Sequence, residues 1–144
     1  MSVRNLLIQG GTSLVQNAQG ETNWSTKAIA TSHACIDSIT AAPNDAARPP
    51  TVFDAGGLLV LPGMVDIHGD AFERQLQPRP DTFFSHEIAL ADTDRQLVAN
   101  GITTACHGLT YSWEGGLRGR ESAIALLEQV ARQRKTAHAD HRIH

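Results

Sequence analysis

Two residues whose side chains can bind a metal ion, His68 and Asp70, stand two positions apart at the end of an apolar stretch. That stretch contains Val65 and Ile67 and is typical of a β-strand, in which positions i and i+2 face the same side. We therefore expect the imidazole and the carboxylate to point together from the end of the strand. Such donors suit a divalent cation like Zn²⁺, although a strand-end histidine also occurs simply as a hydrogen-bonded group.

The first 60 residues, which precede this strand, are expected to be β-rich. Two short apolar runs on either side of Gly10 and Gly11 predict a hairpin. Residues 28–39 are expected to supply one or two more strands. Residues 40–50 have the Pro, Asn and Asp content of a loop, and residues 51–57 predict a strand that ends in a Gly-Gly turn. Together these segments predict a small sheet that packs on something larger.

From Leu58 onward the pattern predicts alternating strands and helices. The strand after Pro62 and Gly63 is almost continuously apolar, as expected of a strand buried on both faces. A polar connection is expected over residues 71–84. The remaining predicted elements are a helix at 85–101 with Ser85 as its N-cap and Gly101 at its end, a strand at 102–108, a helix at 121–135 and a third strand from 140. This order is typical of parallel βα units, which carry chemistry at the carboxyl ends of their strands.

Composition excludes several classes of function. The chain has 144 residues, a net charge of -3 and 5% aromatic residues, which disfavours nucleic-acid binding. It contains no apolar run long enough to span a membrane, and its N-terminus does not resemble a secretory signal. Cys35 and Cys106 lie far apart and suit reduced thiols. We therefore expect a cytoplasmic protein without a membrane or nucleic-acid partner.

The stretch from Val52 to Asp70, with its lead-in Pro-Gly-Met-Val-Asp-Ile-His at 62–68, resembles the amidohydrolase superfamily. In those enzymes a small β-sandwich precedes a (β/α)₈ barrel, and the first barrel strand supplies a His-x-His or His-x-Asp metal pair. The resemblance implies an α/β fold with a β-sandwich portion at residues 1–60 and the first two to three βα units of an incomplete barrel at 61–144. It also implies that His68 and Asp70 bind a divalent metal, Zn²⁺ or Mn²⁺.

Three shorter motifs narrow the resemblance: Pro-Arg-Pro at 78–80, Gly-Ile-Thr-Thr at 101–104 and His-Arg-Ile-His at 141–144. They resemble the diphosphatases of the carbon–phosphorus lyase pathway, which remove pyrophosphate from alpha-D-ribose 1-methylphosphonate 5-triphosphate in phosphonate catabolism. The implied partner is a phosphorylated small molecule. Arg79, fixed between two prolines, either donates a bidentate hydrogen bond to a phosphate or pairs with a nearby carboxylate. Arg74 has a weaker claim of the same kind.

Four further residues bear on the predicted metal site. Asp66 is expected on the same side as His68 but deeper, where a carboxylate can orient a ligand imidazole. His107 ends the next strand and is expected to pack in the core or to support the ligands rather than to bind the metal. At the C-terminus, His144 lies near the metal if it faces the barrel interior, whereas it packs among helices if His141 faces inward. We favour His144 as the inward residue and as a further ligand.

The predicted barrel is incomplete. Only the 82 positions from Gly63 to His144 are available for it, whereas a complete barrel needs roughly 250 residues. We therefore expect an N-terminal fragment that is inactive alone, with the catalytic acid or base on missing strands. Two alternatives remain open: a hydrolase of cyclic amides or other C–N bonds with no special use for Arg79, and a non-catalytic truncated barrel that covers its open edge by forming a homo-oligomer.

Overall fold

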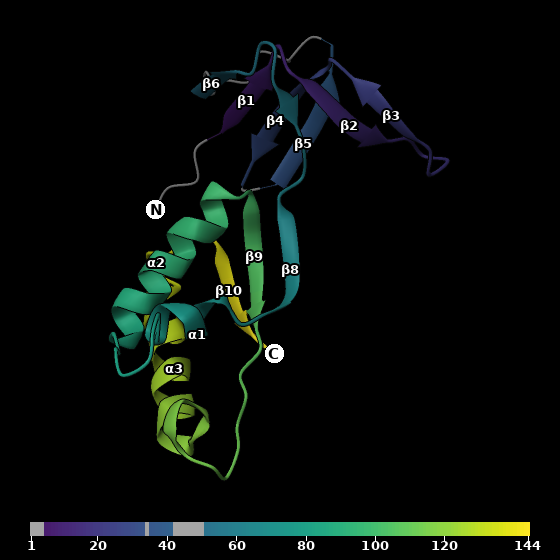
Figure 1. Ribbon diagram of the computed structural model, residues 1–144. Helices are drawn as coiled ribbons and strands as arrows, with labels where there is room; N and C mark the ends of the chain where they lie inside the picture. Colours follow the sequence, from purple (N-terminus) through teal and green to yellow (C-terminus); the bar gives the residue numbers. More distant parts are fainter. Residues whose placement is uncertain (1–4, 34, 42–50) are drawn as a thin grey trace. The chain divides into compact units, whose positions relative to one another are not determined.

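The computed structural model describes residues 5–33, 35–41 and 51–144 (Figure 1). The chain divides into two compact units, Met1–Pro62 and Gly63–His144. Each unit has its own sheets, and each is described separately below.

The described part of the first unit consists of two small sheets. One sheet has the strand order β5-β4-β1-β6 and the other has the order β3-β2-β7. The strands are β1 (Leu6–Gln9), β2 (Thr12–Gln16), β3 (Thr22–Ser25), β4 (Ala28–Ser32), β5 (Cys35–Thr40), β6 (Thr51–Asp54) and β7 (Leu59–Val60). The one or two strands expected within residues 28–39 are present as two, β4 and β5, and the strand expected from residue 51 is confirmed. Strand β3 was not predicted, and most of the expected 40–50 loop lies outside the described residues.

The hairpin predicted at Gly10 and Gly11 is wrong, because β1 and β2 belong to different sheets. Strand β1 pairs with β4 and β6, whereas β2 pairs with β3 and β7. Gly10 has a φ of +79°, and a side chain on Gly11 would come within 2.7 Å of Val60 and 2.9 Å of Ala55. The two glycines therefore allow the chain to pass from one sheet to the other at a point where the backbone is closely packed, rather than to form a hairpin turn.

The second unit has a parallel three-stranded sheet of order β10-β9-β8, as predicted for βα units. Figure 1 shows its helices on one side of this sheet. In chain order the elements are β8 (Met64–Gly69), α1 (Ala71–Leu76), α2 (His86–Ala99), β9 (Ile102–His107), the short 3₁₀ helix η1 (Gly116–Arg118), α3 (Arg120–Gln133) and β10 (Asp140–Ile143). No described helix is long and apolar enough to cross a membrane.

The local signals around α2 act as predicted. The Ser85 hydroxyl accepts a hydrogen bond from the backbone N–H of Ile88 at 3.3 Å, and Gly101 follows the helix with a φ of +77°. The polar connection expected at 71–84 is wrong over its first half, because α1 forms there. Phe72 and Leu76, four residues apart, are both buried on one face of that helix.

The core of the second unit lies between its helices and one face of the sheet. It is formed by Phe72, Leu76, Ala89, Leu90, Leu126 and Val130. Strand β8, however, is not buried on both faces as predicted. Met64, Val65 and Ile67 are 54%, 58% and 75% exposed, because β8 is the edge of the sheet and the described helices pack mainly over its neighbours.

Candidate metal centre

The end of β8 carries an irregularity that sets the direction of its side chains. Between Asp66 and Gly69 the strand advances three residues while its partner β9 advances two, from Ala105 to His107. The extra residue makes a β-bulge, which breaks the alternation of faces on which the sequence argument depended. The Asp66 carboxylate accepts a hydrogen bond from the backbone N–H of His68 at 3.1 Å, so it contacts the backbone of the bulge rather than an imidazole.

The structure brings together two of the predicted ligands, His68 and His144. Their Nδ1 atoms lie 3.3 Å apart and the two exposed rings meet edge to face, with centroids 5.0 Å apart. They come from the carboxyl ends of β8 and β10, which flank β9. Backbone hydrogen bonds hold these ends: Gly108 N–H donates to Gly69 at 2.8 Å, and His144 N–H donates to His107 at 2.8 Å.

The spacing of this imidazole pair fits a shared zinc ion. With Zn–N bonds of about 2.0–2.1 Å and a tetrahedral angle, two ligand nitrogens stand about 3.3–3.4 Å apart. Asp70 is exposed and is the N-cap residue of α1, and its carboxylate forms no hydrogen bond with either histidine. Among the described residues no group of three or more His, Cys, Asp or Glu side chains is placed to hold a metal ion. The chain thus presents two neighbouring nitrogen atoms that could bind one metal ion, Nδ1 of His68 and Nδ1 of His144.

His107 and His141 form a second, buried histidine pair. His107 is 2% exposed, and its Nε2 lies 2.8 Å from Nδ1 of His141. The other nitrogen of His141, Nε2, lies 3.0 Å from the carboxylate of Asp94 on α2. His107 is therefore connected to the candidate ligand His144 through its backbone carbonyl, which accepts the hydrogen bond from the His144 N–H. Its ring packs instead against Phe72 and His141.

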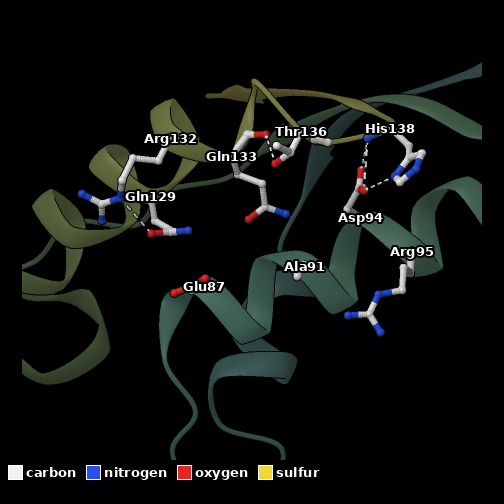
Figure 2. Close-up of a pocket in the computed structure, with 10 residues that line it drawn as sticks. Glu87, Ala91, Asp94, Arg95, Gln129, Arg132, Gln133, Thr136 and His138 are labelled. Carbon is white, nitrogen blue, oxygen red and sulfur yellow. Dashed lines mark hydrogen bonds and ion pairs between the residues drawn. The ribbon is translucent and has the colours of Figure 1, made fainter.

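Asp94 was missed in the sequence, although a signal for it was present. It stands four residues after Leu90 and three before Leu97, on the apolar face of α2, where a carboxylate must find partners. Its oxygens accept from the backbone N–H groups of His138 and Ala139 as well as from ring nitrogens of His138 and His141. Figure 2 shows Asp94 and His138 beside a hollow of about 470 Å³ between α2 and α3.

The buried groups of this network have shifted pKa values. Burial alone would raise the pKa of Asp94, but the hydrogen bonds from Ala139, His141 and His138 outweigh burial and hold that pKa well below its usual range. Burial, followed by the neighbouring His141, lowers the pKa of His107 to about 4, with a small opposing effect of Asp66. Asp94 is therefore an anion and His107 a neutral ring at neutral pH.

The predicted phosphate-binding arginines lie on and after α1. The Arg79 side chain donates through Nε to the Thr82 hydroxyl at 3.2 Å. No carboxylate among the described residues forms an ion pair with Arg79. Arg74 borders a hollow of about 340 Å³ that is also lined by Gln75, Gln77 and Gln96. Its neighbour Glu73 pairs with Arg118 at 3.6 Å.

Comparisons with known proteins give one related sequence and several related structures. No protein-family model matches the chain. The alpha-D-ribose 1-methylphosphonate 5-triphosphate diphosphatase of Escherichia coli (strain K12) is 31% identical over 101 residues, which are 67% of this chain and 26% of that relative. The crystal structure of guanine deaminase from C. acetobutylicum has a TM-score of 0.65 at 13% identity. An amidohydrolase from a Sargasso Sea environmental sample has 0.63 at 18%; each match covers 96% of this chain and about a third of the other.

The fold and the site together define a class of mixed α/β protein. In this class a β unit of two sheets is followed along the chain by parallel βα units, which carry histidines at the ends of their strands. The chain is similar in sequence to that diphosphatase over 67% of its length and similar in fold to the two crystal structures. The chain belongs to the amidohydrolase superfamily. It spans about a quarter of the length of the curated relative.

Proposed function

We propose that this chain contributes the first part of the metal centre of a cytoplasmic, metal-dependent hydrolase that cleaves a phosphoric anhydride. The observation that carries this proposal is the meeting of the His68 and His144 imidazoles, at 3.3 Å, at the ends of two parallel strands. In the proposal these two rings hold a Zn²⁺ or Mn²⁺ ion, and Asp70 adds its carboxylate. A bound divalent cation supplies charge neutralisation and an acidified water for attack on a phosphoryl group.

The proposed substrate is alpha-D-ribose 1-methylphosphonate 5-triphosphate, the compound named for the E. coli relative. A triphosphate carries several negative charges, so its binding requires cationic donors besides the metal. Arg79 is suited to this role, because its bond to Thr82 orients the guanidinium while its other N–H groups have no carboxylate partner among the described residues. Arg74 would add a second positive charge.

Metal titration of the purified chain tests the first half of the proposal. We expect Zn²⁺ binding that is lost in His68→Ala and in His144→Ala, measured by competition with a chromophoric chelator. The matched control is His33→Ala, since His33 is an exposed histidine of the first unit whose ring lies 2.8 Å from the Ser32 hydroxyl, away from the candidate site residues His68 and His144 in sequence. Equal Zn²⁺ affinity in the wild type and in His68→Ala would refute the metal assignment. Repeating the titration with Mn²⁺ identifies the preferred cation.

Ligand binding tests the second half, because we propose that the activity belongs to a larger part of the barrel than these residues supply. In calorimetry, Arg79→Ala is expected to weaken binding of the methylphosphonate triphosphate about tenfold, as expected for one lost charge-assisted hydrogen bond. A cyclic amide serves as the competing ligand. Binding of the cyclic amide but not of the triphosphate would favour the alternative of C–N bond hydrolysis.

A further inference from the structure

A continuous chain of side-chain hydrogen bonds connects helix α2 with the ends of the parallel strands. Asp94 bonds to Nε2 of His141 at 3.0 Å, and Nδ1 of His141 lies 2.8 Å from Nε2 of His107. These three residues are each at most 4% exposed. Because they are almost entirely buried and bond to one another, each hydrogen bond must have one definite donor and one definite acceptor.

The Asp94 carboxylate decides where the protons lie. An ionised carboxylate only accepts, so the Nε2 atom of His141 that faces it must carry a hydrogen. Asp94 also accepts from His138 and Ala139 at 2.9–3.1 Å, so its charge is shared among several donors. When His141 carries a single proton, that proton is on Nε2, its Nδ1 is bare, and His107 must donate to it from Nε2. The tautomers of both histidines follow from one residue on the helix.

The same network supports the two rings of the candidate metal centre. The carbonyl of His107 accepts from the backbone N–H of His144 at 2.8 Å. Gly108, the next residue, leaves room for the His68 imidazole, since a methyl group there would lie 2.7 Å from the ring. Holding His107 in one orientation therefore holds the backbone against which both His68 and His144 rest.

We propose that Asp94 is a positioning residue that fixes His141 and His107 as Nε2–H tautomers and, through His107, places the imidazoles of His68 and His144 for metal binding. The tautomer assignment stands on the hydrogen bonds alone, whereas the effect on metal binding rests on the proposed function. In this proposal Asp94 contacts neither of the candidate ligands His68 and His144 nor the substrate.

Long-range proton–nitrogen NMR spectra of the ¹⁵N-labelled chain, without metal and at neutral pH, test the tautomers directly. We expect a protonated Nε2 and a bare Nδ1 for both His107 and His141. In Asp94→Asn the two rings are expected to show averaged tautomers. In the control Asp92→Asn, on the same helix, they are expected to stay unchanged, because within residues 5–33, 35–41 and 51–144 the Asp92 carboxylate bonds only to Gln96. A bare Nε2 on either ring of the wild type would overturn the assignment, even if Asp94→Asn fails to fold.

Zinc affinity of the same proteins tests the positioning role. Residues that support ligand imidazoles typically change metal affinity 10–100-fold, so we expect at least a tenfold loss in Asp94→Asn and no change in Asp92→Asn. Altered tautomers with an unaltered zinc affinity would overturn the positioning role. If the wild type binds no zinc while its tautomers are as assigned, the proposed function fails and the tautomer assignment is upheld.

Discussion

Substituting alanine for Gly108 is expected to disable the candidate metal centre with little cost to the fold. The new methyl group would lie 2.7, 3.0 and 3.2 Å from Cε1, Nε2 and Nδ1 of His68. Carbon atoms in contact normally stand about 3.5–4.0 Å apart, so the imidazole must move by about 1 Å. Because His68 is exposed and its ring bonds to no described residue other than His144, the ring rather than the backbone should move. The expected loss in unfolding free energy is therefore below about 1 kcal/mol.

A displacement of about 1 Å is large for a metal ligand, whose bond length is set within about 0.2 Å. Zinc affinity should accordingly fall at least tenfold in Gly108→Ala, measured by chelator competition, while a urea titration shows nearly unchanged stability. Gly56→Ala, in the first unit, controls for a glycine substitution that does not approach a histidine. Unchanged zinc affinity in Gly108→Ala, together with its loss in His68→Ala, would refute the steric argument.

The remaining predictions concern stability. Burial, and next the neighbouring His141, lower the pKa of His107 from 6.5 to about 4, so as the pH falls the unfolded chain binds this proton first. The resulting stabilisation of the folded state, about 3 kcal/mol, is present in full above pH 6.5 and is lost as the pH falls toward 4. Denaturation of His107→Gln should lack that acid dependence. Gly63→Ala would drive a methyl group into Thr103 and should cost about 1–3 kcal/mol in urea denaturation, with only partial recovery in the Gly63→Ala/Thr103→Ala double variant, because the Cβ of residue 103 stays 2.7 Å from the new methyl group. Ser85→Ala should lose about 1 kcal/mol by removing the N-cap, and an unchanged urea midpoint would contradict the role of the cap.

The spacing of apolar residues and the residues that begin and end helices predicted most elements of the second unit. Helix α2 is bounded by Ser85 and Gly101 because capping depends on residues next to each other in the chain. Spacing of apolar residues likewise located α3, and alternation of elements predicted the parallel sheet. Such features are local, so that a single sequence contains most of what determines them.

Other features depended on contacts between distant residues and were not predictable. The bulge after Asp66 arises from pairing with β9, and it changes which side chains share a face. The role of Asp94 depends on the loop before β10, because two backbone N–H groups of that loop donate hydrogen bonds to its carboxylate. The crossing at Gly11 required knowing that Ala55 and Val60 would lie against it. In each case the deciding partner lies more than 30 residues away.

The crossing between the two sheets of the first unit also bears on how that unit folds. Strands β6 and β7 each complete a different sheet by pairing with β1 and β2, about 45 residues earlier in the chain. Contacts of such long sequence separation carry a high loop-closure entropy and slow the rate of folding. During synthesis the pairings of β6 with β1 and of β7 with β2 are complete only after residue 60 has left the ribosome. These two pairings should then acquire hydrogen-exchange protection later than the antiparallel pairs β2–β3 and β4–β5.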